Sequence, residues 1–237
     1  MLLSVIVPAF NEQAYLGKTL DSILRSIEAE AAKVELIVVD NASTDATPHI
    51  ASSAGARVAF EPVHNVARAR NRGAAASSGE VLVFIDADTL VPIGTFQRIR
   101  EAMADPSCYG GAFDIRYDPK SALIRAYLAF WRMVGNALNM AQGAAQFCRR
   151  DAFIALGGYD ERLFMGEDVD FHWRLRGHAK RHGGTVSRIS DLRVSSSARR
   201  FDLWPAWKTL VWTNPLLVLL FQRQQRVWRG WYEDPPR

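Results

Sequence analysis

Short, continuously apolar segments alternate with longer segments of helical periodicity from the N-terminus to residue 85. The apolar segments show no polar alternation, which is typical of strands that are buried on both faces of a sheet. Strands separated by helices predict right-handed crossovers and a mainly parallel sheet, and so an α/β fold. The expected strands are 2–7, 34–39, 57–60 and 81–85, and the expected helices are 13–31, one ending near 54, and 67–77.

The pattern is less regular after residue 105. It predicts an antiparallel strand at 110–117, a long aromatic-rich helix at 122–140, a short strand at 145–148 and a helix that begins near 169. From residue 186 onward, β-branched, basic and tryptophan residues are mixed, and the pattern assigns no element there. We therefore expect three parts: a first half at 1–105, a smaller second half with an antiparallel element at 106–202, and a helical appendage at 203–237.

Composition sets limits on the class of protein. The 237 residues are 49% hydrophobic and 23% charged, which excludes a disordered or collagenous chain. The formal net charge of +4 suits phosphate-bearing ligands or an anionic membrane surface. Two cysteines are too few for a disulfide framework, and neither an export signal nor an apolar stretch of about 18 residues is visible, so we expect a cytoplasmic setting.

Acidic side chains follow the predicted strands at the points where the strands end. Glu12 follows the first strand, Asp40 ends the second, and Asp86 and Asp88 end the fourth. The carboxyl ends of parallel strands share one edge, which is where open sheets bind ligands. Because residues i and i+2 of an extended segment point the same way, Asp86 and Asp88 can face one Mn²⁺ or Mg²⁺ ion. A single carboxylate of this kind would be explained as well by a turn or a helix cap.

An arginine-rich segment opens the helix predicted at 67–77. Guanidinium groups suit phosphate recognition, and a helix N-terminus adds partial positive charge. Arg68 and Arg72 share one side of the helix while Arg70 points elsewhere, so at most one or two of the three can meet a ligand. The alternative is an ordinary solvated helix face.

A second acidic concentration lies at the start of the helix that begins near 169. The helix dipole stabilises the charged forms of Glu167, Asp168 and Asp170, which explains one or two of them on structural grounds alone. A carboxylate held ionised beside a hydroxyl would also serve as a general base. His172 follows Asp168 by one turn, and a packed or solvated histidine is favoured there over a metal ligand.

Five segments occur in the order found in one known family: VIVPAFNE at 5–12, VVDNASTD at 38–45, ARNRG at 69–73, DAD at 86–88 and GEDVD at 166–170. Over residues 2–177 the chain resembles the family 2 glycosyltransferases, which have the GT-A fold. The resemblance implies a metal-dependent, inverting transfer of a sugar from a nucleotide-diphosphate donor to a hydroxyl acceptor. UDP is the commoner nucleotide in such donors. That acceptor could be lipid-linked, a cell-envelope glycan or a small molecule. The segment SSSARRF at 195–201 also resembles a small bacterial subgroup of these enzymes.

The resemblance makes 1–105 the nucleotide-binding half and 106–202 the acceptor and catalytic half. Pro8, Phe10 and Glu12 would line the nucleoside pocket. Asp40 would accept a hydrogen bond from the base, and Arg70 would lie near the base or the phosphates.

The resemblance also implies the metal site and the base. Asp86 would reach the ribose or the metal, and Asp88 would ligate the metal that bridges the diphosphate. Asp168 would be the catalytic base, and Arg199 or Arg200 would close over the diphosphate. The sequence shows no convincing third metal ligand; His178 and His182 are candidates by proximity in sequence alone.

Aromatic and basic residues are interleaved in the appendage. Such a pattern suits the headgroup region of an anionic bilayer and would bring the protein to a lipid-linked acceptor at the inner face of the cell membrane. A helix packed on the domain and a homodimer contact are the alternatives, while nucleic-acid binding is not expected because no binding motif is present. The residues concerned are Trp204, Trp207, Trp212, Trp228, Trp231, Arg223, Arg226 and Arg229.

Two other functions compete with sugar transfer. A sugar nucleotidyltransferase would need a glycine-rich phosphate loop after the first strand, and residues 8–12 contain no glycine. A catalytically silent sugar-nucleotide or carbohydrate-binding module would not need a base at Asp168.

Overall fold

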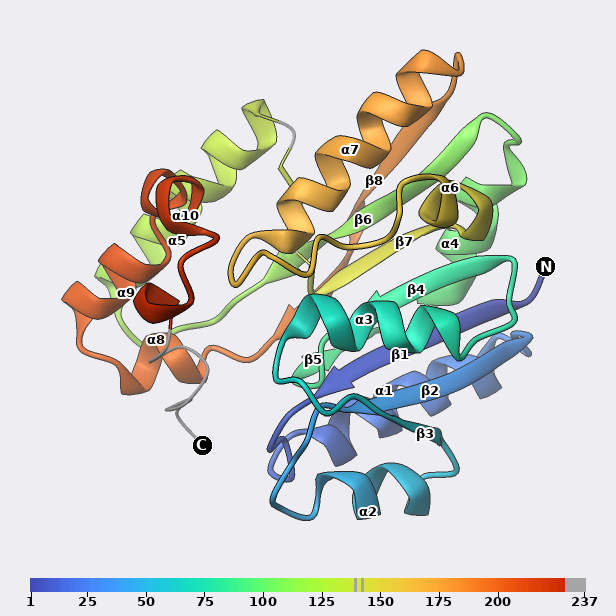
Figure 1. Ribbon diagram of the computed structural model, residues 1–237, viewed down its shortest axis with the longest axis horizontal. Helices are drawn as coiled ribbons and strands as arrows, with labels where there is room; N and C mark the ends of the chain where they lie inside the picture. Colours follow the sequence, from blue (N-terminus) through green and yellow to red (C-terminus); the bar gives the residue numbers. More distant parts are fainter. Residues whose placement is uncertain (139, 142, 229–237) are drawn as a thin grey trace.

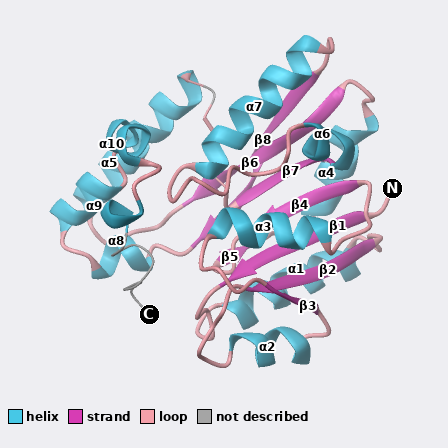
Figure 2. Ribbon diagram, viewed as in Figure 1, coloured by secondary structure: helices cyan, strands magenta, loops and turns pink. Residues whose placement is uncertain are grey.

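A mixed eight-stranded sheet forms the centre of the molecule, and helices cover both of its faces (Figures 1 and 2). The computed structural model describes residues 1–138, 140–141 and 143–228. The strand order is β3-β2-β1-β4-β7-β6-β8-β5. The expected α/β class is confirmed, and the same sheet runs through both predicted halves.

The first half has the predicted alternation of strands and helices, with all of its main strands parallel. Ala9 pairs with Asp40, and Asp40 pairs with Phe60, so neighbouring strands end at the same edge of the sheet. The elements are β1 (Leu3–Ala9), α1 (Leu16–Ala29), β2 (Val34–Asp40), α2 (Thr47–Ser53), β3 (Arg57–Phe60), α3 (Val66–Ala75) and β4 (Val81–Ile85).

The second half brings antiparallel pairing into the sheet. β7 is antiparallel to both β4 and β6, as the expected antiparallel element requires, whereas β6 is parallel to β8. The sequence pattern missed β5, α4, α6 and the long strand β8. The elements are β5 (Thr89–Leu90), α4 (Thr95–Ala104), β6 (Cys108–Arg116), α5 (Ala122–Ala137), β7 (Ala145–Arg149), α6 (Arg150–Ala155), α7 (Glu167–Arg181), β8 (Thr185–Ser196), α8 (Arg199–Leu203), α9 (Ala206–Trp212) and α10 (Pro215–Phe221).

Alternate side chains of the central strands supply two apolar cores, one on each face of the sheet. Val5 and Val7 of β1 pack on the face that α1, α2 and α4 cover, and Ile6 packs on the face of α3, α6 and α7. Gly73 lets α3 lie close to that face, because a Cβ atom there would come within 2.3 Å of Ile6 Cγ2. Helix α3 therefore rests directly above β1 and aims its N-terminal turns at the strand ends.

The appendage lies beside α5, away from the sheet (Figure 1). The Tyr127 hydroxyl on α5 donates to the Leu210 carbonyl of α9, and Trp228 Nε1–H donates to the Phe221 carbonyl of α10. Trp204 and Trp228 are buried, so most of the described tryptophans pack inward and only Trp207 is strongly exposed. Trp231 and Arg229 lie outside the described residues. No helix in the described part of the chain has the length and apolar character needed to cross a membrane.

Candidate active site

A cavity of about 1190 Å³ opens where β1 and β4 end and α7 begins. It also extends between α5, α7 and the C-terminal helices. Its wall contains every predicted site residue except Asp40: Pro8, Phe10, Glu12, Arg70, Asp86, Asp88, Asp168, Arg199 and Arg200.

Asp40 lies beside this cavity and not in its wall. Its carboxylate accepts a hydrogen bond of 2.9 Å from the Ser43 N–H, which makes it part of the turn after β2. Asn41, the next residue, does line the cavity. A role for Asp40 in binding the base therefore stays a prediction.

The metal-ligating pair predicted at 86–88 is brought to the cavity by a turn. The Thr89 N–H donates to the Asp86 carbonyl, so the segment is not extended and the argument from alternating side chains does not apply. Both carboxylates nevertheless face the cavity. Burial, with smaller contributions from the neighbouring Asp86 and Glu12, raises the pKa of Asp88 to about 6 against the opposing effect of Arg199.

Arg199 joins the C-terminal segment to this acidic edge. Its guanidinium group makes a bidentate ion pair with Glu12, with 2.6 Å between NH1 and Oε2, and lies 3.4 Å from Asp88 Oδ2. The group also stacks 4.4 Å from the ring centre of Tyr15 and is buried. One arginine therefore balances part of the negative charge of two carboxylates, one that follows β1 and one that follows β4.

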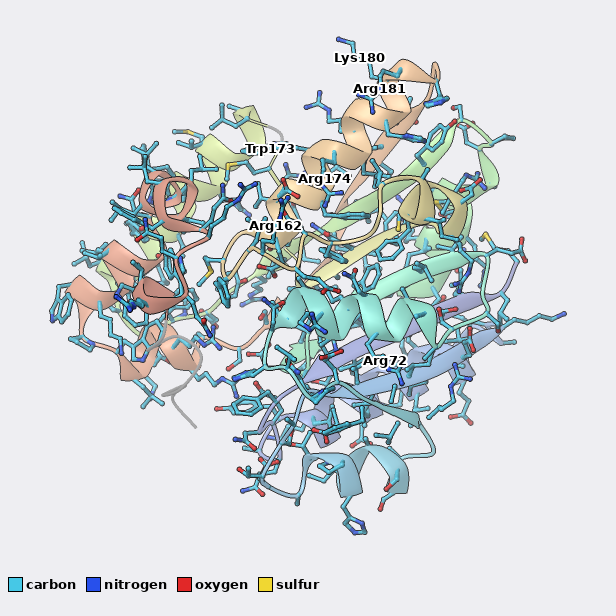
Figure 3. The ribbon with its side chains drawn as sticks, in the orientation of Figure 1. Arg72, Arg162, Trp173, Arg174, Lys180 and Arg181 are labelled. Carbon is cyan, nitrogen blue, oxygen red and sulfur yellow. The ribbon has the colours of Figure 1, made fainter. Side chains whose placement is uncertain are left out.

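Arg70 is the only one of the three helix arginines on the cavity wall. It is 2% exposed and bridges two carboxylates, with 2.8 Å to Asp86 Oδ1 and 2.6 Å to Glu167 Oε1. Arg68 instead pairs with Glu61 and Glu161, and Arg72 points away towards β3 (Figure 3). These two ion pairs fix the start of α7 against the end of β4.

Asp168 stands at the N-terminus of α7, as predicted, and faces the cavity. Its carboxylate accepts hydrogen bonds from the N–H groups of Gly143 (2.5 Å) and Val169 (2.7 Å). A Cβ atom at Gly143 would lie 2.8 Å from Asp168 Cβ, so this close approach requires glycine. Burial, and secondarily the neighbouring Glu167, raise the pKa of Asp168 to about 7, although Arg70 opposes the shift. A carboxylate with such a pKa is well placed to exchange a proton near neutral pH.

The histidines do not supply a third metal ligand. His172 is buried, and desolvation lowers its pKa to about 4. His178 and His182 stack on one another and on Tyr109, near the C-terminal end of α7 and so on the order of 15–20 Å from Asp168 at 1.5 Å per residue. Among the described residues, no group of three His, Cys, Asp or Glu side chains could hold a metal by itself.

A divalent cation still fits Asp86 and Asp88. Their oxygens are hard ligands, both residues line the cavity, and phosphate oxygens could complete the coordination shell.

Three residues of the site escaped the sequence analysis. The ring centre of His64 lies 3.6 Å from that of Phe10, and both residues line the cavity. Tyr117 is hydrogen-bonded to Ser196, and burial together with the three nearby aspartates raises the pKa of its hydroxyl. Gly143 supplies the N–H that holds Asp168. No motif marks these positions, because each reaches the cavity through the path of a loop or a strand end.

Comparisons with known proteins show the family of this chain. A family model described as Glycosyl transferase family 2 matches residues 4–157, more than half of the 237-residue chain. The chain is 29% identical over 244 residues to validoxylamine A glucosyltransferase of Streptomyces hygroscopicus subsp. limoneus, a match covering 80% of this chain and 50% of that protein. It is 39% identical over 98 residues to glucosyl-3-phosphoglycerate synthase of Mycobacterium tuberculosis, covering 38% and 30% respectively. The chain thus spans about half the length of the first of these relatives.

Solved structures show the same fold. The mannosyltransferase PcManGT from Pyrobaculum calidifontis, in complex with GDP-Man and Mn²⁺, superposes with a TM-score of 0.70 at 22% identity, covering 96% of this chain and 64% of that one. Glucosyl-3-phosphoglycerate synthase from Mycobacterium tuberculosis, in complex with Mn²⁺, UDP and glucosyl-3-phosphoglycerate, gives 0.64 at 23% identity, covering 93% and 79%. The fold expected from the sequence motifs is therefore confirmed as GT-A, and the chain belongs to glycosyl transferase family 2.

Proposed function

We propose that this chain transfers a sugar from a nucleotide-diphosphate donor to a hydroxyl group of an acceptor, with inversion at the anomeric carbon. The donor that we propose is a UDP-sugar. The observation that carries the proposal is that the acidic pair Asp86 and Asp88 and the half-buried carboxylate Asp168 line one cavity. Solved neighbours in complex with UDP or GDP-Man and with Mn²⁺ support this type of donor.

The two ends of the cavity would take different parts of the donor. Pro8 and Phe10, with His64 beside them, would hold the nucleoside. Arg199 and Arg200 would face the diphosphate. Asp86 and Asp88 would hold Mn²⁺ or Mg²⁺, and a divalent cation bound there would offset the negative charge of the leaving diphosphate.

Asp168 would act on the acceptor. Its carboxylate would take the proton of the attacking hydroxyl as that oxygen bonds to the anomeric carbon from the side opposite the diphosphate. The bonds from Gly143 and Val169 orient the carboxylate before the acceptor arrives. A single displacement of this kind needs no covalent sugar–enzyme intermediate.

Replacing Asp88 with alanine should weaken UDP binding in the presence of Mn²⁺ more than about 100-fold, because loss of a ligand exceeds the 10–100-fold effect of losing an outer-shell partner. Titration calorimetry with UDP, with and without Mn²⁺, measures the effect. Asp118→Ala, which removes an exposed carboxylate, is the matched control and should bind like the wild type. Equal affinity in the Asp88 variant and the wild type would exclude this metal site.

We also infer that the apolar face formed by α5, α9 and α10 rests on an anionic membrane, on the cytoplasmic side. Large apolar side chains on all three helices face solvent; Trp207 is 64% exposed and Leu220 is 72% exposed. Arg132 on α5 and Arg223 and Arg226 after α10 supply the positive charge that anionic headgroups would pair with. The acceptor end of the cavity is lined by the same helices, so a lipid-linked acceptor could enter from the bilayer.

The combined substitution of Trp207 and Leu220 by glutamate should abolish sedimentation with phosphatidylglycerol vesicles, because it places two charges on the apolar face. Ile154→Glu, at an exposed apolar position on α6, is the control and should still sediment. Sedimentation velocity of the same proteins without vesicles tests the homodimer alternative. A wild-type dimer that the double variant turns into a monomer, with no vesicle binding by either, would assign the face to a second copy instead.

A further inference from the structure

We propose that the acceptor carries an anionic group, a phosphate or a carboxylate, and that Arg176 and Arg188 bind it on the acceptor side of the cavity. This inference rests on the proposed sugar transfer and specifies its acceptor. It concerns a part of the cavity wall that neither the donor nor the metal would occupy.

One face of α7 carries the first half of this subsite. Asp168, His172 and Arg176 follow one another at intervals of four residues, so they lie on the same side of the helix, and all three line the cavity. Eight residues correspond to about 12 Å along a helix axis. A hydroxyl at Asp168 and an anion at Arg176 would thus be separated by up to two helical turns, a distance that an acceptor with a sugar between its hydroxyl and its phosphate could bridge.

Arg188 of β8 supplies the second half. Its Nε and one terminal nitrogen both donate to Asp114 Oδ1, at 2.9 and 2.7 Å, and Asp114 is itself buried. These two hydrogen bonds to one oxygen hold the guanidinium group in place, while 40% of the Arg188 side chain remains exposed. Its other N–H groups can therefore meet a ligand in a defined orientation.

The wall around these residues carries an excess of positive charge. Arg176 makes no ion pair or hydrogen bond with any residue that the structure describes, and Asp114 balances only Arg188. Burial lowers the pKa of His172 to about 4, and the positive charges of Arg176 and Arg188 contribute to this shift. His172 is therefore neutral near pH 7. Arg132 and Arg193 add two more cavity-lining guanidinium groups without an ion pair in the described part of the chain. An anion would complete this charge set.

The donor diphosphate is not the anion that Arg176 and Arg188 would bind, because it would lie near Arg199. Arg199, on the donor side, already pairs with Glu12 and lies near Asp88. Arg176 instead lies about two turns after Asp168 on α7, and Arg188 lies on β8. Two separate anion-binding regions therefore flank the catalytic carboxylate.

Inorganic phosphate is the probe for the test. With UDP and Mn²⁺ saturating, so that the donor side is filled, calorimetry should show phosphate binding to the wild type and an affinity about 10–100-fold lower in Arg176→Ala, as expected for loss of a hydrogen bond to a charged group. Arg181→Ala removes an exposed arginine near the far end of the same helix (Figure 3) and should bind phosphate like the wild type. Arg188→Gln should weaken binding as well, and Arg176→Ala, which breaks no described contact, remains interpretable if Arg188→Gln fails to fold.

The remaining outcomes separate this inference from the proposed function. Phosphate affinity that is equal in Arg176→Ala and wild type, or lowered equally in Arg181→Ala, would overturn the subsite. Failure of the wild type to bind UDP with Mn²⁺ would count against the donor assignment, and phosphate titrations of the protein alone would still test the arginines. Vesicles of phosphatidic acid distinguish the two sources of phosphate: weaker binding of Arg176→Ala than of Arg181→Ala assigns a lipid phosphate, and equal binding assigns a soluble one.

Discussion

We expect Asp168→Asn to lower the turnover number by about 10²–10⁴-fold, the usual contribution of a general base, and to leave the affinity for UDP and Mn²⁺ unchanged. Asparagine keeps the shape of the side chain and can still accept from the Gly143 N–H, but it cannot take a proton. Asp170→Asn, two residues along the helix, is the matched control, because Asp170 pairs with Arg174 and is not the proposed base. Transfer is measured as UDP release from a UDP-sugar that the wild type turns over. An active Asp168 variant would place the base elsewhere, and a wild type that binds donors without turnover would favour the silent binding module.

The pH dependence follows from the same carboxylate. With a pKa of about 7 in the folded protein, Asp168 is protonated and inactive at lower pH, so kcat should rise about tenfold per pH unit below 7 and level off above it.

Stability should show the opposite trend. The folded chain keeps this proton up to about pH 7, whereas the unfolded chain releases it near 3.8. The contribution of Asp168 to stability therefore falls between those two pH values as pH rises. Asp168→Asn should consequently be at least as stable as wild type at pH 8, which a urea titration checks. A large loss of stability would mean that low activity reflects misfolding.

We expect Arg70→Met to lower the free energy of unfolding by about 3–5 kcal/mol, the effect of removing one partner from a buried ion pair. Arg70 is 2% exposed and is the shared partner of Asp86 and Glu167, so the substitution leaves two carboxylates without their cation. Urea unfolding monitored by tryptophan fluorescence measures the change. Arg72→Met, which removes an exposed arginine from the same helix, should cost far less.

A second substitution tests the cause. Neutralising one of the stranded carboxylates, in Arg70→Met combined with Glu167→Gln, should recover part of the lost stability, because the two effects share a contact and do not add. Strict additivity would mean that the loss comes from packing and not from unpaired charge.

Local patterning was sufficient to predict most of the first half of the fold. The strands 57–60 and 81–85 agree with β3 and β4 to the residue, because short apolar runs between helices leave little choice. β8 was missed for a physical reason. Of its 12 residues only Ile189 and Val194 are buried, and its register against β6 is irregular. Its sequence therefore shows no regular alternation of apolar and polar residues.

The candidate site was also predictable from the sequence only in part. Asp86, Asp88 and Asp168 could be named because strand ends and a helix start are visible in the sequence. The partners that set their properties could not: Arg199 meets Glu12 across 187 positions, and Gly143 reaches Asp168 through a loop. The pKa of Asp168 arises from burial, which only the assembled cavity provides.

The ion pair between Glu12 and Arg199 has a consequence for recombination among relatives. A crossover anywhere between α1 and β8 would take the acid from one parent and the base from the other. Hybrid genes that keep both of these segments from a single parent avoid that mismatch.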